Sequence, residues 1–422
     1  MLITYRTVLS VEILAACPSK GEAETDCYNK SLMHHLSLFV LAATATAFVH
    51  PGALHTIKDF ERINTHVANG DEPWNTSWAL LEASKYAQAS YEPTPKEIVY
   101  RGANGVDSEN YPSLYRDTAA AYQLAIRWKI SNDTGYADAA VNILSSWAAT
   151  LTGIDGTSDK FLASGLYGYQ MANAAELMSD YSGWDSSNKT ATATMLTEVF
   201  ASMNTLFLEE HNGNDYYHYY ANWDQCNIAS LLAIGIFTDN QTMYDYALDF
   251  VRTGPSNGAL PVFAIANYTE SGSDKVLTQG QEAGRDQGHS TLDIVLLGII
   301  AQQAYNQGDD LFATYSNEIL NAAEYVGKYN VGNDVPYTLY ESYEGDQTVI
   351  SNSSRGEIRP GFELLSAHYG QLKGLDSSWT DAYRDWVNAN STGGVEGGGG
   401  SYASTSGGFD GLGFGSLLYR IS

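Results

Sequence analysis

Three polar and aromatic stretches of the sequence hold the residue types that proton transfer and carboxylate binding require. They run from Tyr216 to Gln225, from Gln281 to His289, and from Asn333 to Tyr340. The first two lead directly into apolar segments, as the first turns of helices do. We therefore expect a polar site in which these three stretches meet.

The second stretch contains a cation and an imidazole at a spacing that suits chemistry. Arg285 and His289 are four residues apart, so they share one face if the helix already begins there. A guanidinium binds a carboxylate through two hydrogen bonds, and its charge favours a neutral imidazole that can accept a proton. The alternative is structural, with Arg285 paired to Glu282 or Asp286 and His289 capping the helix. Gln287, between the two, is a candidate for substrate binding.

In the first stretch, an amide and an indole stand just before an apolar helix expected over 228–237. Asn222 would donate from its amide, and Trp223 would offer a platform for a sugar ring. The alternative is an Asn N-cap beside a buried Trp. The Tyr-rich run that ends at Tyr220 suits carbohydrate contact better than a dry core, and Tyr220 is a further candidate for substrate binding.

Charge and motifs exclude several classes of protein. The chain has 49 acidic and 22 basic residues and a formal net charge of -27, which repels nucleic acid. Long-range attraction of a polyanion would be poor as well, so an acidic substrate would need a local cluster of donors and Arg. The sequence holds no phosphate-binding loop, dinucleotide fingerprint, zinc-ligand spacing or nucleophile elbow. We expect no metal and no cofactor.

The elements that would position these residues are helices. Apolar residues recur at helical spacing in two clear stripes, one from Tyr136 to Trp147 and one from Leu292 to Ile300. Short polar breakers at 131–135 and 306–310 have the length that joins antiparallel helices. From about residue 77 to 330 this pattern predicts an all-α fold, an incomplete α/α toroid of helical hairpins around a central cleft.

The sequence changes in character after residue 330. It becomes rich in Tyr, Gly and Ser, with a run of four glycines at 397–400. One helix is expected near 362–372, and loops or short strands over the rest.

The N-terminal segment has the layout of an export signal. Between Met33 and Ala47, two His residues precede a short apolar run and a small-residue motif, so we expect cleavage before Phe48 and an upstream extension over 1–32. We therefore divide the chain into 1–47 and a single catalytic domain at 48–422. The apolar run is too short for a permanent membrane anchor.

Export is also consistent with the cysteines and the glycosylation signals. Cleavage before Phe48 leaves Cys226 as the one cysteine, which would be free. Seven Asn-X-Ser/Thr sequons indicate a secreted, N-glycosylated protein, which we expect to be a monomer; they begin at Asn75, Asn132, Asn188, Asn240, Asn267, Asn352 and Asn390.

Four motifs resemble a known family. They are His50–His55, Asn222–Asp224, Glu282–His289 and Tyr305–Leu311. Over about residues 48–375 the chain resembles the alginate lyase-like α/α-toroid polysaccharide lyases, particularly the fungal and bacterial branch called polysaccharide lyase family 38. Lyases of this kind cleave acidic polysaccharides such as alginate, polymannuronate or glucuronan by β-elimination.

The resemblance implies roles for individual residues. Asn222 matches the Asn that neutralises the substrate carboxylate, and Arg285 matches the family's Arg. His289 falls where related lyases have a catalytic Tyr, and Trp223 falls where they have a His; these departures suggest that His289 is the base. His55, in the first motif, becomes a candidate for substrate binding.

β-Elimination sets the chemical requirements. The C5 hydrogen of a uronic acid becomes acidic only when the adjacent carboxylate is neutralised, which Asn222 and Arg285 would do. A base then removes this proton and an acid protonates the departing oxygen. Tyr337 is the first candidate for the acid, because Val335 and Pro336 would hold it in an extended loop. Tyr340 and Tyr369 are the alternatives.

Two other functions fit the same residues. A glycoside hydrolase on a similar toroid would use a carboxylate pair drawn from Asp224, Glu282 and Asp286. A carbohydrate-binding protein would use the aromatic residues for stacking and Arg285 only for binding. Elimination is distinguished by its product, which carries a conjugated, ultraviolet-absorbing double bond.

Overall fold

The computed structural model describes residues 47–422, which form one compact unit. The expected export signal and upstream extension lie outside the described residues, apart from Ala47. No helix among residues 47–422 is long and apolar enough to cross a membrane.

Most of the described chain is helical, and the helices are numbered in chain order. They are α1 (Ile57–Asn69), α2 (Trp74–Ala83), α3 (Pro112–Ser131), α4 (Thr134–Thr150), α5 (Lys160–Leu177), α6 (Ser186–Met195), α7 (Ser202–Glu210), α8 (Ala221–Phe237), α9 (Gln241–Thr253), α10 (Leu260–Phe263), α11 (Gln287–Asn306), α12 (Thr314–Asn330), α13 (Phe362–Leu365), α14 (Ser378–Ala389) and α15 (Gly415–Leu418). A π-helical turn joins α6 to α7, and another, Ser366–Leu372, extends α13.

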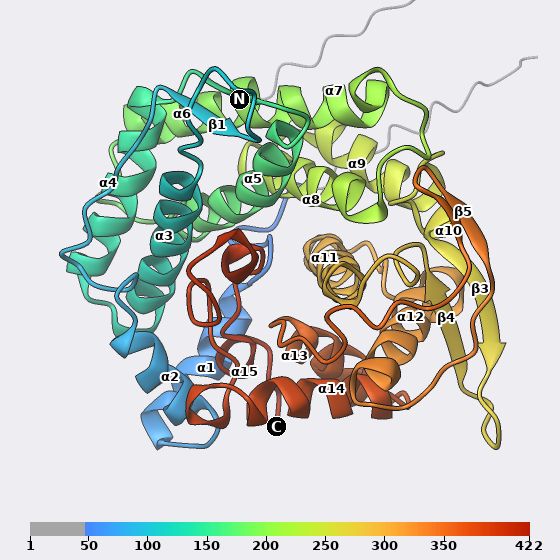
Figure 1. Cartoon of the computed structure of the whole chain (residues 1–422). Coiled ribbons are helices and arrows are strands. Elements are labelled where there is room, and N and C mark those ends of the chain that lie inside the picture. The colour runs from blue at the N-terminus through green and yellow to red at the C-terminus, as the bar shows by residue number, and fades with distance from the viewer. Residues whose placement is uncertain (1–46) are drawn as a thin grey trace, which may run out of the picture. The chain divides into compact units, whose positions relative to one another are not determined.

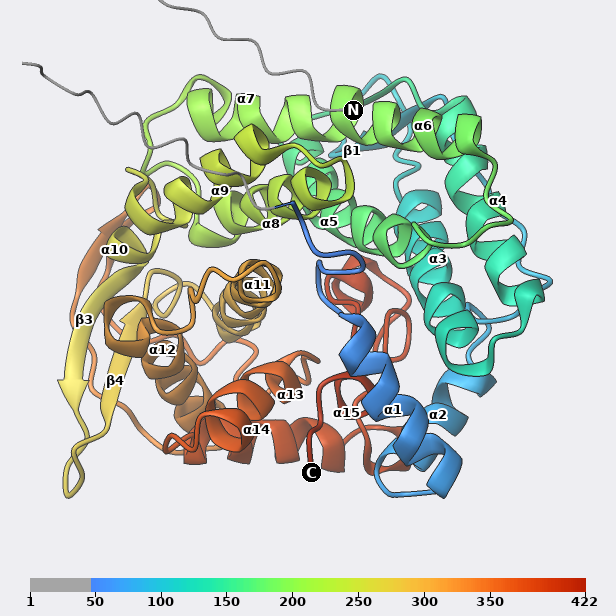
Figure 2. The ribbon, with the colours of Figure 1, turned by 180° about the vertical axis from the view of Figure 1, so that it is seen from behind.

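The helices form a ring, which confirms the predicted toroid (Figure 1). Helices α3, α5, α8 and α11 pack side by side as an inner wall, and α4, α9 and α12 cover α3, α8 and α11 from outside. Burial follows this arrangement: α8 and α11 are buried on nearly every face, whereas α9 buries one apolar stripe. Seen from behind, α1 and α15 lie side by side where the ring closes (Figure 2).

Three short two-stranded sheets accompany the helices. The parallel pair is β1 (Ile98–Arg101) with β2 (Gly153–Gly156), and the antiparallel pairs are β3 (Ala264–Thr269) with β4 (Val276–Gly280) and β5 (Tyr340–Ser342) with β6 (Gly345–Gln347). The sequence predicted short strands only after residue 330, where β5 and β6 lie. The other four strands were missed because each pairs with a single partner and shows no clear alternation.

The predicted helices are observed with longer bounds. The two apolar stripes lie in α4 and α11, and the helix expected at 362–372 is α13 with its π-helical extension. Helix α14, inside the Gly- and Tyr-rich part, was not predicted. It buries Tyr383 and Val387 on one face, whereas Trp386 is 41% exposed.

The segment that begins the described chain ties several helices together. His50 Nδ1 lies 2.8 Å from Glu176 of α5, and its Nε2 lies 3.1 Å from Asp239 after α8. The Asn306 side chain at the end of α11 donates to the Ala53 carbonyl. We call residues 49–54 the N-terminal clasp.

The clasp predicts a pH dependence of stability. The hydrogen bond to Glu176, with the charge of Asp239, raises the pKa of His50 to about 9. A raised pKa means that the stabilisation is complete below the ordinary imidazole range, near 6.5, and is lost as the pH rises through about 9. We expect urea unfolding to show a loss of stability between pH 6.5 and 9 that His50→Gln reduces. An identical pH dependence in the variant would contradict this.

Candidate active site

The predicted residues Asn222 and Arg285 meet at a buried carboxylate. Glu282 is fully buried in the turn before α11; its Oε1 accepts the Asn222 backbone N–H at 3.4 Å and its Oε2 accepts from Arg285 Nη1 at 2.8 Å. Burial raises the pKa of Glu282, although the charges of Arg285 and His289 oppose this. The structural pairing considered for Arg285 is therefore present, and it fixes the guanidinium in place.

Arg285 keeps a surface for an anion despite this pairing. Its guanidinium carbon lies 4.2 Å from the centroid of the Tyr220 ring, and its side chain is 25% exposed. Its Nη2 has no hydrogen-bond acceptor among the described residues. A guanidinium held by a carboxylate and an aromatic ring binds a further carboxylate with little loss of side-chain entropy.

His289 is oriented by Asp286, which also begins the helix. Asp286 Oδ1 caps α11 by accepting the His289 backbone N–H at 2.8 Å, and Oδ2 lies 2.6 Å from His289 Nδ1. Burial favours a higher pKa for Asp286, but the hydrogen bond and charge of His289 hold it below its ordinary value. The His289 side chain is 39% exposed. A Nδ1–H that donates to Asp286 leaves Nε2 free to accept a proton.

The expected helical spacing of Arg285 and His289 is wrong, although the two residues do meet. Helix α11 begins at Gln287, so Arg285 precedes it and the two do not share a helix face. They meet at Asp286, whose Oδ2 lies 3.8 Å from Arg285 Nε. The turn before α11 therefore brings Arg285 and His289 together, as the four-residue spacing was expected to do.

The Asn222 side chain is buried and makes no hydrogen bond with the described residues. Tyr220 is the N-cap of α8, so the alternative of an Asn N-cap is wrong. Asn222 is 2% exposed, and within residues 47–422 neither its Oδ1 nor its Nδ2, the donor that a carboxylate needs, makes a hydrogen bond. A buried polar group left unpaired costs about 1–3 kcal/mol, which is typical of groups kept for a ligand.

Three tyrosines surround this centre, and a fourth does not. Tyr337 donates to the Gln347 carbonyl at 2.8 Å, and burial raises its pKa to about 12. Tyr340 accepts the Gly284 N–H at 3.0 Å, and Tyr220 donates to Glu344 at 2.7 Å. The alternative acid Tyr369 is buried elsewhere, with its hydroxyl on the Phe312 carbonyl.

Two predicted substrate contacts, Gln287 and His55, occupy packing positions. Gln287 is buried and bonds to the Ala283 and Ser351 carbonyls and to Asn330. His55 is buried at the start of α1, 2.5 Å from the Tyr122 hydroxyl. Both side chains are therefore buried in the framework, and their hydrogen bonds are to other residues of the chain.

Trp223, predicted as a platform for a sugar ring, packs against two other aromatic rings. Its ring lies 4.6 Å from Tyr219 and 5.9 Å from Phe207, centroid to centroid. The indole is half-buried. The indole packs against the loop before α8 through Tyr219.

Sequence reasoning missed a further cation, Arg101. Arg101 of β1 lies between Tyr111 and Tyr167, 5.1 Å and 5.7 Å from their ring centroids, and no carboxylate of residues 47–422 lies within salt-bridge distance. Its charge acts on the thiol of Cys226, one helical turn after Asn222. An isolated Arg in a short strand gave no sequence signal.

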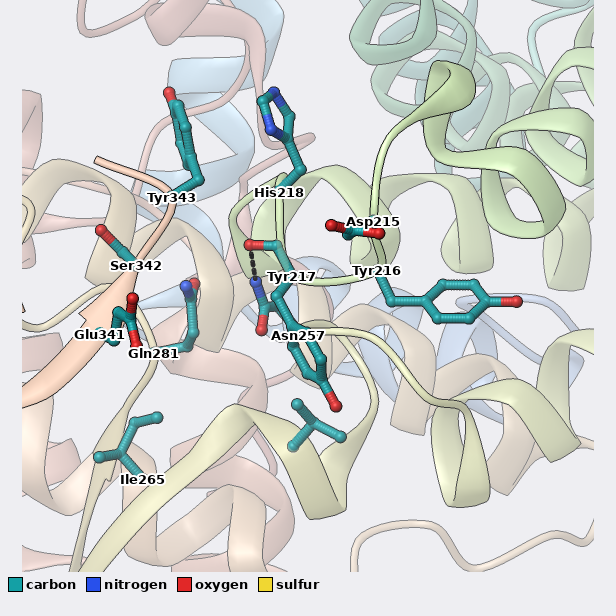
Figure 3. A pocket seen from close by; sticks show the side chains of 11 residues that line it. Asp215, Tyr216, Tyr217, His218, Asn257, Ile265, Gln281, Glu341, Ser342 and Tyr343 are labelled. Atoms are coloured by element: carbon teal, nitrogen blue, oxygen red, sulfur yellow. Dashed lines mark hydrogen bonds between the residues drawn. The ribbon is translucent and has the colours of Figure 1, made fainter. Parts of the chain in front are cut away.

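A cavity of about 680 Å³ opens beside the centre (Figure 3). The loop before α8, the β5–β6 hairpin and the β4–α11 turn form its walls. Its lining residues are Asp215, Tyr216, Tyr217, His218, Asn257, Val262, Ile265, Gln281, Glu341, Ser342 and Tyr343. It adjoins the predicted residues because Ser342 and Tyr343 contact Tyr220. Within residues 47–422 no group of three His, Cys, Asp or Glu side chains is placed to hold a metal ion.

Comparison with solved structures shows the same fold. Alginate lyase A1-III from a Sphingomonas species is 15% identical, with a TM-score of 0.55, over 89% of this chain and 98% of that chain. A variant of that enzyme complexed with a tetrasaccharide has 15% identity and a TM-score of 0.57 over 89% and 97%. An alginate lyase from Bacteroides ovatus has 12% identity and a TM-score of 0.57 over 89% and 100%.

Comparison of sequences gives the family. A search of curated proteins found no significant match. The family model described as alginate lyase matches residues 78–335, which hold α3 to α12 and the centre built on Asn222, Arg285 and His289. The chain belongs to the alginate lyase family and is a polysaccharide lyase.

Proposed function

We propose that the enzyme cleaves a uronic acid polysaccharide by β-elimination, with His289 as the base. The observation that carries this is the arrangement around Glu282 and Asp286: an oriented imidazole beside a held guanidinium and an unpaired amide. Arg285 and Asn222 would take the substrate carboxylate, which stabilises the enolate-like transition state.

The proton transfers follow from these positions. Nε2 of His289 would remove the C5 proton, the C4=C5 double bond would form, and the C4–O4 bond would break. The departing oxygen needs a proton, and Tyr340 is the proposed donor, because its hydroxyl accepts from Gly284 while its own proton has no recorded acceptor. Tyr337, the first candidate from the sequence, is the alternative, since its proton already bonds to the Gln347 carbonyl.

Hydrolysis is less well supported by the same contacts. Asp224 is buried against His211 at 2.9 Å and the Gly258 N–H at 2.8 Å. Glu282 is held by Arg285, and Asp286 by His289. A glycosidase needs one carboxyl at the leaving oxygen and another at the sugar or its water, and each of these three has a structural partner.

Product analysis tests the proposal directly. Purified enzyme mixed with polymannuronate, polyguluronate or glucuronan is expected to produce ultraviolet absorbance from the unsaturated chain end. Formation of new reducing ends without that absorbance would show hydrolysis, and binding without either would show a carbohydrate-binding protein.

Arg101 is expected to bind a second substrate carboxylate. Arg101→Gln should raise KM about tenfold, the cost of one charge-assisted hydrogen bond, and change kcat little because the residue is outside the reacting centre. Arg116→Gln removes the same charge from an exposed position on α3 and is the control. Equal KM values for wild type and Arg101→Gln would remove Arg101 from the binding site.

We further propose that the enzyme is secreted and glycosylated and belongs to the branch called polysaccharide lyase family 38. Six of the sequon residues are exposed, which suits glycosylation: Asn75, Asn132, Asn188, Asn267, Asn352 and Asn390. Asn240 is half-buried and caps α9 through Met243. N-terminal sequencing of secreted protein is expected to find Phe48 first.

A further inference from the structure

The cavity beside the catalytic centre has a lining unlike the centre itself. None of the described residues that line it is Lys or Arg, whereas Asp215 and Glu341 are both present. Both carboxylates are exposed and make no recorded side-chain hydrogen bond. The hairpin adds Glu344 and Asp346 within a few residues. A uronate carboxylate placed here would lie beside Asp215 and Glu341, with no Lys or Arg in the lining to offset their charge; Arg285 lies on the far side of Tyr220.

The rest of the lining is suited to an uncharged sugar. Tyr217 and Tyr343 are 62% and 50% exposed, so their ring faces are accessible to a ligand in the cavity. The ring of Tyr343 lies 4.7 Å from that of His218, and Figure 3 shows the two projecting together at the cavity rim. Flat aromatic faces and hydroxyl groups match the apolar and polar faces of a sugar ring.

A buried amide in the cavity wall points to a ligand independently of the charges. Gln281 is 3% exposed and lines the cavity. Its Oε1 accepts the Ala221 N–H at 3.1 Å, which fixes the side chain, and its Nε2 has no recorded hydrogen bond. A fixed amide donor that lacks a partner is suited to a sugar hydroxyl.

The cavity is directly connected to the catalytic centre. Gln281 precedes Glu282, and Ser342 Oγ lies 3.4 Å from the Tyr220 hydroxyl, whose ring covers Arg285. A sugar in the cavity would therefore be a neighbour of the uronate held at Arg285.

We infer that this cavity is a subsite for a neutral sugar, so that the preferred substrate alternates uronic acid with neutral sugar units. The inference rests on the proposed elimination and narrows its substrate class. A homopolymer of uronic acid would place a carboxylate in the cavity, at an electrostatic cost that salt reduces.

The test removes the two charges that line the cavity. For wild type we expect higher kcat/KM on a polymer that alternates glucuronate with a neutral hexose than on glucuronan, at low ionic strength. Asp215→Asn combined with Glu341→Gln should raise kcat/KM on glucuronan about fivefold relative to kcat/KM on the alternating polymer. The gain should shrink at 0.5 M salt, where charges are screened over a few ångströms.

The control removes two charges elsewhere. Glu61→Gln with Glu92→Gln changes exposed carboxylates of α1 and of the segment before β1, and it should alter neither rate. Equal rates of wild type on both polymers, or no gain on glucuronan in the double variant, would overturn the subsite. Absence of unsaturated product from both polymers would reject the elimination itself and the subsite with it.

Discussion

His289→Ala is expected to lower kcat by about two to four orders of magnitude, the usual contribution of a positioned base. The imidazole is held by Asp286 at 2.6 Å, so its free nitrogen has a fixed direction. Substrate binding should persist because Arg285 keeps its contacts to Glu282 and Tyr220. The variant should also lose the acid-side limb of its pH–rate profile, since that limb reports protonation of the base.

A second variant separates the chemistry of His289 from its packing. Asp286→Asn keeps an oxygen to cap α11 but removes the charge that orients the imidazole, so kcat should fall less than in His289→Ala and the acid-side limb should shift. Near-full elimination activity of His289→Ala with an unchanged profile would make His289 structural. The base would then be sought among Tyr220, Tyr337 and Tyr340.

Asn222→Ala is expected to separate activity from stability. Loss of the amide should lower kcat by about 10²–10³, because carboxylate charge in the transition state loses a donor. The side chain makes no recorded hydrogen bond, and its buried Oδ1 is unpaired, so its removal should leave the free energy of unfolding unchanged or raise it. Steady-state kinetics and urea unfolding of the same preparation measure both.

Asn227 provides the matched control one helical turn and a residue further along α8. Its amide donates to the Trp223 carbonyl at 2.7 Å and its oxygen accepts from Asn204, so Asn227→Ala should destabilise the protein. A marked loss of stability in Asn222→Ala, or a loss of the acid-side pH limb, would contradict the role assigned to Asn222.

The sequence predicted the ring because helix formation here is local. A helix of this kind can be predicted from a short stretch of sequence. The apolar residues of α4 and α11 recur at helical spacing, and short polar breakers separate the helices. The turn from Gln281 to His289 could be proposed as a site from the sequence alone, since its residues are contiguous. The sequence left the start of this helix open, and it begins at Gln287 because the Asp286 side chain caps it.

What the sequence could not provide was long-range pairing. The Gln287 side chain contacts Asn330 and Ser351, and the roles of Tyr337 and Tyr340 depend on where the β5–β6 hairpin folds back. His55 was predicted to bind substrate, but its imidazole lies against the Tyr122 hydroxyl of α3. Arg101 became visible only when β1 brought it against Tyr167 of α5.

The closure of the ring has a consequence for the order of folding. Arg62 of α1 donates to the Leu418 carbonyl, Gln123 of α3 to the Gly399 carbonyl, and the N-terminal clasp binds Asn306. These partners are separated by 253 to 356 positions, so an emerging chain cannot make the clasp contact before Asn306 is synthesised, or the other two before Gly399 and Leu418 are. The entropy of closing such large loops makes these contacts late events. A nascent chain that lacks residues 399–418 could therefore form helical hairpins but could not close the ring.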